Sequence, residues 1–257
     1  MVGSQVYAHG GSVSPVTAPS PDPRASLRDT LPTATERPPV VLGVDGRRGR
    51  WCGALLHPDG WVGHLDLADA TAVLSAADSC GAAVVGIDVP MGLPETAQRV
   101  ADLAARRLLR PGGASSRVFP APPRAALAAR THAEAVVIAR ELTGLGISVQ
   151  TWCLRHAIAS GAQMAGDRRV VEVHPELSFL AMTGSVLPSK KTPRGRDVRL
   201  AALAAAVPGL DVSAVPPHDD AVDALACAWT ARRWAAGTAE VLGGDPDGAG
   251  RPMRIVS

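Results

Sequence analysis

Aromatic side chains are scarce in this sequence: Phe, Trp and Tyr make up 3% of its 257 residues. A protein with so few rings is poorly suited to stack many bases of a single-stranded nucleic acid. The apolar content is nevertheless 46%, so Ala, Val and Leu must build the core of one large or two small domains. The net charge of +2 is too small to indicate a strongly basic nucleic-acid-binding protein, although it allows a local basic groove.

Cysteines are also few. Cys52, Cys80, Cys153 and Cys227 lie far apart, and no pair has the CxxC spacing of a zinc knuckle or a redox pair. Their mostly apolar flanks predict reduced core positions, as in a cytosolic protein. No apolar run reaches membrane-spanning length and the first residues lack the pattern of a signal peptide, so we expect a cytoplasmic protein without a membrane partner.

Both ends of the chain offer little apolar surface. Residues 1–38 are rich in Ser, Pro, Thr and Gly and cannot offset the entropy lost on ordering, which predicts a disordered N-terminal tail. Residues 243–257 are rich in Gly and Asp before a short apolar patch, and we interpret them as a C-terminal tail. The segment between them, residues 39–242, is expected to form a single domain.

Five short apolar, β-branched segments in this domain predict strands. They span residues 39–45, 51–56, 61–67, 83–89 and 169–174. Turn residues separate the first three, which predicts an antiparallel meander, whereas helical segments precede the last two, which predicts parallel strands. Helices are expected at residues 69–79, 95–109, 124–143, 152–162, 175–183, 196–206 and 218–237. This order is typical of an α/β, RNase H-like fold with a mixed five-stranded sheet flanked by helices.

Four carboxylates lie inside apolar segments, where an ionised side chain is unfavourable unless it is paired or bound to a metal. Asp45 ends the first strand, Asp88 lies near the end of the fourth, and Glu172 interrupts the fifth. Asp223 is the polar residue within the apolar stretch from Ala221 to Trp229. A helix that is apolar on nearly all sides is normally buried, so Asp223 in particular indicates a functional site.

Simpler interpretations remain open for most of these acids. Asp45 precedes a glycine and fits a turn, and Asp88 fits a loop cap before a proline. Asp219 and Asp220 follow two prolines, where acids commonly cap a helix. Glu172 fits an ion pair with a buried arginine. Asp223 lies too deep in its helix for an ordinary cap.

The spacing of these acids supports a shared site. Asp220 and Asp223 are three residues apart and share a helix face, and acids near the ends of adjacent strands can project to one edge of a sheet. Two unit charges about 4 Å apart repel by about 4 kcal/mol at an effective dielectric constant of about 20. Such a cluster needs protons or cations, and oxygen ligands select Mg²⁺ or Mn²⁺. Two such ions would clamp the attacking and leaving oxygens of a phosphodiester displacement.

Six motifs in order resemble the domain-of-unknown-function family 429 (DUF429), which is predicted to be an RNase H-like nuclease. They are GVDG at 43–46, IDVPMGLP at 87–94, SSRVFPAPPR at 115–124, VEVHPELSF at 171–179, SKKTPRG at 189–195 and HDDAVDALACAWTAR at 218–232. The resemblance covers residues 40–242. It implies an RNase H-like domain over the predicted residues 39–242.

The closing segment DDAVDALA also resembles the final helix of Holliday-junction resolvases, in which two acids three apart complete a metal site begun by a first-strand Asp. This resemblance implies that Asp45, Asp88, Asp220 and Asp223 bind metal and act in catalysis, with Glu172 as an auxiliary catalytic residue. The resolvase pattern has Glu where this chain has Asp88, which leaves the number of metal ions open.

Further polar residues are candidates for substrate binding. They are His174, Glu176, Lys190, Lys191, Arg117 and Arg124. A His beside carboxylates can orient or protonate a water or a leaving group, and Lys and Arg can hold phosphates. The alternative is a hydrogen-bonded strand-end His and basic loops that face solvent. Arg99 and the arginines that follow it are expected on a solvated helix face.

These observations predict a divalent-metal-dependent nuclease or phosphodiesterase that acts on DNA, RNA or a small phosphodiester. One alternative is a non-catalytic RNase H-like binding module. An actin-like kinase is a weaker alternative, because such a kinase needs a second domain and Gly-Thr phosphate loops, and about 200 residues are too few for both halves.

Overall fold

The computed structural model describes residues 37–257; residues 1–36, which belong to the predicted N-terminal tail, lie outside the described residues. The strands are β1 (Val41–Arg47), β2 (Arg50–Leu56), β3 (Val62–Leu67), β4 (Val84–Ile87), β5 (Val170–Glu172), β6 (Val241–Pro246) and β7 (Pro252–Val256). The helices are α2 (Ala70–Ser79), α3 (Val100–Leu109), α4 (Arg124–Leu127), α5 (His132–Thr143), α6 (Val149–Cys153), α7 (Arg155–Met164), α8 (Pro175–Thr183), α9 (Pro193–Ala206) and α10 (Asp219–Ala235), with 3₁₀ turns η1 (Ser115–Arg117) and η2 (Val212–Ala214).

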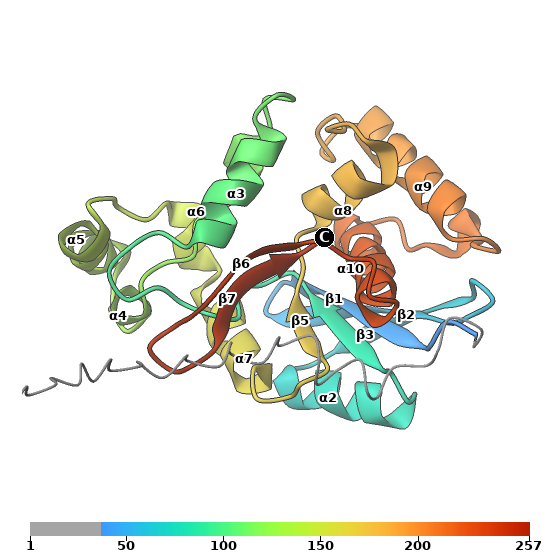
Figure 1. Ribbon diagram of the computed structural model, residues 1–257, viewed down its shortest axis with the longest axis horizontal. Coiled ribbons are helices and arrows are strands. Elements are labelled where there is room, and N and C mark those ends of the chain that lie inside the picture. Colours follow the sequence, from blue (N-terminus) through green and yellow to red (C-terminus); the bar gives the residue numbers. More distant parts are fainter. Residues whose placement is uncertain (1–36) are drawn as a thin grey trace, which may run out of the picture. The chain divides into compact units, whose positions relative to one another are not determined.

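The first five strands form one mixed sheet in the order β3-β2-β1-β4-β5 (Figure 1). β1 pairs antiparallel with β2, and β2 pairs antiparallel with β3. β4 pairs parallel with both β1 and β5. The predicted α/β fold, with a three-stranded meander and two parallel strands flanked by helices, is therefore confirmed.

The two faces of the sheet carry different side chains. Successive residues of a strand point to opposite faces. Leu42 and Val44 of β1 pack in a core with residues of α2 and α7. Gly43, between them, faces α10, because a Cβ at this position would lie 1.9 Å from the carbonyl oxygen of Ala224. The same alternation sends Asp45 to the α10 face.

Glycine is required where α10 crosses the central strands. Gly43 of β1 and Gly86 of β4 are direct neighbours in the parallel pairing. A Cβ at Gly86 would lie 2.6 Å from the carbonyl oxygen of Cys227, so at both positions the backbone of α10 approaches the strand directly. The closing helix thus lies against the sheet at backbone distance, which fixes the position of every residue on its inner face.

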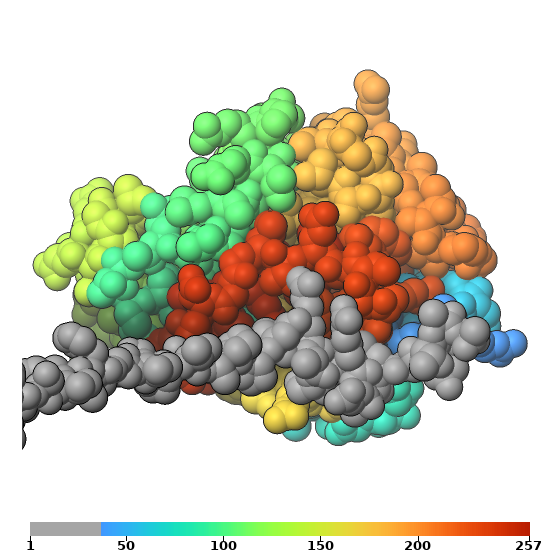
Figure 2. All heavy atoms as spheres, in the orientation of Figure 1, coloured from blue at the N-terminus to red at the C-terminus, as the bar shows by residue number. Residues whose placement is uncertain are grey.

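The C-terminal residues 243–257, which we interpreted from the sequence as a tail, form most of a β-hairpin instead. β6 and β7 pair antiparallel, and Val256 bridges to Val173 just after β5. Ile255 is buried in a cluster with α3. Figure 2 shows this C-terminal segment, in red, against the green helix α3. The apolar patch at the end of the sequence provides the buried surface that orders the hairpin.

The helical segment expected at residues 124–143 is divided into α4 and α5. Thr131 breaks it, since its side chain accepts a hydrogen bond from the backbone N–H of Glu134 and caps α5. No helix in the described part of the chain has the length and apolar character needed to cross a membrane.

Candidate active site

A cavity of about 520 Å³ lies where the parallel strands end and α10 begins. Ten of the eleven site residues predicted from the sequence line it: Asp45, Asp88, Asp220, Asp223, Glu172, His174, Glu176, Lys190, Lys191 and Arg117. The exception is Arg124, which forms ion pairs with Glu95 (3.1 Å) and Asp247. Residues from the first strand to the last long helix therefore meet in one pocket.

Asp45, Asp88 and Asp223, here called the acid cluster, lie together because of the glycine contacts described above. Asp45 follows Gly43 by two residues and Asp88 follows Gly86 by two, so both point to the α10 face at the carboxyl ends of neighbouring parallel strands. Asp223 adjoins Ala224, which touches Gly43. Asp45 and Asp223 are buried, and Asp88 is partly exposed.

The three carboxylates destabilise one another's ionised forms. Burial raises the pKa of Asp45 well above its ordinary value, and the charges of Asp88 and Asp223 raise it further. Burial raises the pKa of Asp223 to about 6, although the adjacent Lys190 opposes the shift. The pKa of Asp88 is raised by burial as well, against lowering contributions from His174 and Lys190. Such mutual repulsion marks a place where positive charge is favoured.

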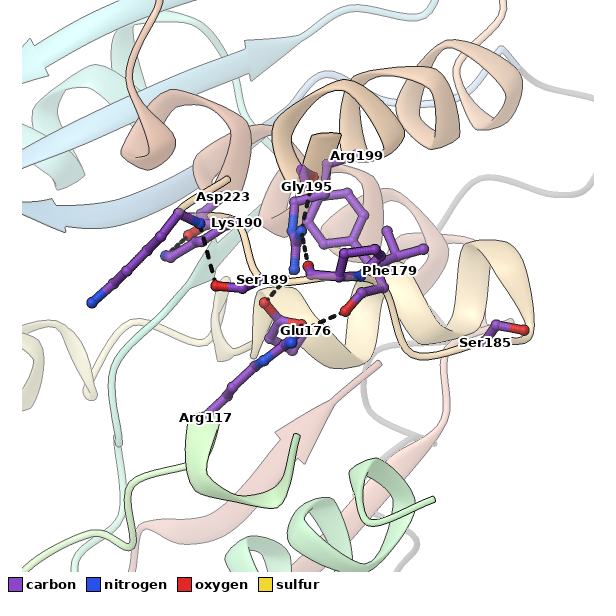
Figure 3. A network of polar contacts seen from close by, with 12 residues as sticks. Arg117, Glu176, Phe179, Ser185, Ser189, Lys190, Gly195, Arg199 and Asp223 are labelled. Atoms are coloured by element: carbon purple, nitrogen blue, oxygen red, sulfur yellow. Dashed lines mark hydrogen bonds and ion pairs between the residues drawn. The ribbon is translucent and has the colours of Figure 1, made fainter. Parts of the chain in front are cut away.

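Lys190, on the loop between α8 and α9, supplies part of that positive charge. Its Nζ forms an ion pair with Oδ2 of Asp223 (Figure 3). Burial alone would lower the pKa of Lys190, but the charges of Asp223, Asp45 and Asp88 raise it above its ordinary value. The ammonium group thus acts as a counter-ion for the whole acid cluster.

The acid cluster does not form a ready-made metal site. Within residues 37–257, no three His, Cys, Asp or Glu side chains are arranged so that they would hold a metal ion. The donor chemistry itself suits Mg²⁺ or Mn²⁺, since the cluster consists of carboxylate oxygens. Lys190 forms an ion pair with one of these carboxylates, so a metal ion bound by Asp223 would compete with its ammonium group.

Asp220 lines the same pocket and lies near enough to Asp45 for its charge to raise the pKa of that carboxyl. It is within 3.3 Å of Nε of Arg47 and 3.7 Å of Nδ1 of His218, and about a third of its side chain is exposed. Neither Asp219 nor Asp220 caps α10, because the side chain of His218 accepts the hydrogen bond from the N–H of Ala221. Both acids lie in the first turn of the helix, where negative charge is favoured by the helix dipole.

Glu172 forms a buried ion pair with Arg99, as expected from the simpler interpretation of this acid in the sequence. Nη2 of Arg99 lies 2.6 Å from Oε1 of Glu172, and its Nη1 donates to Oε2 at 2.8 Å. Because Glu172 pairs with Ile87 rather than with Asp88, it points to the face of the sheet opposite the acid cluster. Glu172 therefore supports the wall of the pocket.

Arg99 was expected on a solvated helix face, and that prediction is wrong. Its guanidinium also contacts Asp102, at 2.5 Å, and donates to the carbonyl oxygen of Gly92. The side chain is almost completely buried. The signal in the sequence was Asp102, three residues later, because an acid at that spacing faces the arginine on a helix.

Glu176 and Arg117 belong to a second ion-pair network that holds the Lys190 loop. Nη1 of Arg117 lies 2.7 Å from Oε2 of Glu176, and Nη2 of the buried Arg199 lies 2.6 Å from Oε1 (Figure 3). Arg199 also donates to the carbonyl oxygen of Pro188, two residues before Lys190, at 2.7 Å. This network fixes the base of the loop that carries Lys190.

His174 follows β5 and lines the pocket close enough to Asp88 to lower that carboxyl's pKa. Its Nδ1 atom is buried and has no hydrogen-bond partner among the described residues. A buried imidazole nitrogen without a partner is unfavourable, which indicates that a ligand or a water completes its environment.

Comparison with known protein families adds one finding. The model of the family described as "Protein of unknown function (DUF429)" matches residues 43–248. The chain belongs to the DUF429 family. The resemblance found from the six motifs is thereby confirmed, and the DUF429 match includes every residue of the acid cluster. Comparison with curated proteins and with solved structures gives no match.

Proposed function

We propose that this DUF429 protein is a divalent-metal-dependent phosphodiester hydrolase with an RNase H-like fold. The observation that carries the proposal is the convergence of Asp45, Asp88 and Asp223 on one face of the sheet, with Lys190 as their adjacent cation. The meander followed by two parallel strands, in the order β3-β2-β1-β4-β5, supports the RNase H-like assignment.

Mg²⁺ or Mn²⁺ would be held by carboxylate oxygens of the acid cluster after Lys190 moves from Asp223. When bound, such an ion lowers the pKa of a bound water and stabilises negative charge on a phosphate. Lys190, once released, can stabilise the substrate's phosphate as a point charge. His174, beside Asp88, is the candidate to donate a proton to the leaving oxygen.

A non-catalytic binding module is the second candidate, and the Lys190–Asp223 ion pair favours it. An ammonium group that stayed on Asp223 would neutralise the acid cluster without a metal ion. The two candidates differ in whether Mn²⁺ binds the folded protein. The four cysteines, all free thiols, support the further proposal of a cytoplasmic location.

The proposal is tested by hydrolysis of bis(p-nitrophenyl) phosphate with and without Mn²⁺. We expect Mn²⁺-dependent hydrolysis that falls on the order of 100-fold in Asp45→Asn and in Asp223→Asn, as when an electrostatic group is removed from an active site. The matched control is Asp66→Asn, since Asp66 lies on β3, is exposed and forms an ion pair with Arg50 of β2. Equal activity in all four proteins would contradict the proposal.

A further inference from the structure

Apolar side chains also line the pocket, beside the acid cluster. This part of the lining, here called the apolar wall, consists of Val118, Phe119, Pro120, Pro122, Leu154 and Ile158. Binding sites for small molecules are commonly cavities of about 300–1,000 Å³ with apolar walls and a few polar groups, and this cavity of about 520 Å³ falls in that range. The pocket therefore suits a ligand with one apolar part and one polar part.

The charges that line the pocket disfavour a long nucleic acid. Among the described residues, seven carboxylates but only four Lys or Arg side chains line it. Arg99, Arg117 and Lys190 are already paired with carboxylates of the protein. A polynucleotide is held mainly by Lys and Arg contacts to many successive phosphates, and this pocket offers few.

Phe119 gives the apolar wall an exposed aromatic face. The residue is 41% exposed although it lines the pocket. Its neighbours are anchored: Arg106 donates to the carbonyl oxygen of Val118 at 2.8 Å, and the N–H of Ala121 donates to Asp102 at 2.8 Å. Two prolines beside Ala121 further restrict the backbone. An exposed ring on an anchored backbone segment is suited to stack on a planar group of a ligand.

We propose that the substrate is a nucleotide phosphodiester of one or two nucleosides, with a base stacked on Phe119 and the phosphodiester at the acid cluster. The proposal rests on the hydrolase function above. In the reaction, the oxygen of a water bonds to phosphorus and one P–O ester bond breaks. The leaving oxygen takes up a proton, so the products are a phosphate monoester and an alcohol.

The test compares a dinucleotide with single- and double-stranded oligonucleotides of about 20 nucleotides, in the presence of Mn²⁺. For each oligonucleotide, kcat/KM is divided by the number of its phosphodiester linkages. We expect kcat/KM for the dinucleotide to be at least tenfold higher than this value for either oligonucleotide. Phe119→Ala should raise KM for the dinucleotide about tenfold, since stacking on one base contributes about 1–3 kcal/mol. The control is Val137→Ala, another exposed apolar residue, on α5 and outside the pocket.

Binding of adenosine monophosphate, measured by calorimetry, separates this proposal from the proposed function. If bis(p-nitrophenyl) phosphate is hydrolysed but the oligonucleotides are cleaved as well as the dinucleotide, the substrate proposal is overturned and the hydrolase function stands. If no phosphodiester is hydrolysed but the nucleotide binds and Phe119→Ala weakens it about tenfold, the ligand class is supported and the hydrolase function fails. If Phe119→Ala binds adenosine monophosphate with the same affinity as the wild type, the substrate proposal is overturned.

Discussion

Lys190 and Asp223 form an ion pair within a pocket where carboxylates outnumber basic side chains. Asp223 is almost completely buried, whereas more than a third of the Lys190 side chain is exposed. The carboxylate is thus fixed by α10, whereas Lys190 lies on a loop and part of its side chain faces solvent. This asymmetry makes Lys190 the partner that can leave when another cation arrives.

Replacing Lys190 by Met should therefore tighten Mn²⁺ binding. The substitution removes the positive charge that competes for Asp223 and repels a cation near Asp45 and Asp88. We expect the dissociation constant for Mn²⁺ to fall about tenfold in a calorimetric titration, equivalent to about 1.4 kcal/mol. Arg168→Met, which changes an exposed basic residue outside the pocket, is the control. Weaker Mn²⁺ binding in Lys190→Met would show that the two cations do not compete.

Asp45 is expected to destabilise the metal-free protein at neutral pH. Its pKa is raised in the folded state, so the folded protein holds this proton more tightly than the unfolded chain. Stability is therefore lost as the pH rises above the unfolded pKa of about 3.9 and through the higher folded value. Asp45→Asn removes this titration and keeps a side-chain oxygen for the N–H of Gly46.

We expect Asp45→Asn to have a higher free energy of unfolding than the wild type at pH 7.5 and a value within about 0.5 kcal/mol of it at pH 3. Urea denaturation without divalent cations measures both. If Asp45→Asn is less stable than the wild type at pH 7.5, the surroundings of Asp45 stabilise its ionised carboxylate, and the prediction is wrong.

Arg99 should contribute strongly to stability. Arg99→Met leaves Glu172 and Asp102 buried without their cation, which typically lowers the free energy of unfolding by about 3–5 kcal/mol. Arg107→Met, on the exposed side of the helix α3 that follows Arg99, should change it by less than about 0.5 kcal/mol. Equal stabilities of the two variants, measured by thermal or urea unfolding, would refute the role given to Arg99.

Gly43 should be intolerant of even a methyl group. A Cβ there would lie 1.9 Å from the carbonyl oxygen of Ala224 and 2.2 Å from the backbone nitrogen of Ala228, so Gly43→Ala must push α10 off the sheet. We expect a loss of about 3 kcal/mol, at the upper end of overpacking effects. Gly166→Ala is the matched control, since a Cβ at Gly166 meets no atom within 4 Å. A stable Gly43→Ala with unchanged Mn²⁺ binding would contradict the packing account.

The sequence predicts the sheet and the acid cluster well because both depend on local patterns. Apolar strand segments and turn residues determine the meander, and an acid inside an apolar segment is visible without any structure, as Asp223 illustrates. Asp45 and Asp88 meet because each follows, by two residues, a glycine that touches α10. The spacing was present in the sequence, but its meaning depends on the register of two strands.

The remaining interactions depend on partners far apart in the chain. Arg99 and Glu172 are separated by 73 residues, and nothing local to Arg99 distinguishes a buried arginine from a solvated one except Asp102. The C-terminal hairpin was missed because the glycines of β6 suggest a tail, whereas the burial of Ile255 against α3 depends on tertiary packing. Arg124 was grouped with Arg117 because both belong to one loop motif, but Arg124 pairs with Glu95 and Asp247 outside the pocket.

The central claim is that Asp45, Asp88 and Asp223 bind a divalent cation together, and calorimetric titration of Mn²⁺ at pH 7.5 tests it most directly. We predict saturable binding to the wild type and to Asp66→Asn, and an affinity at least about tenfold lower in each of Asp45→Asn, Asp88→Asn and Asp223→Asn. No detectable binding to the folded wild type, or equal binding in all five proteins, would contradict it.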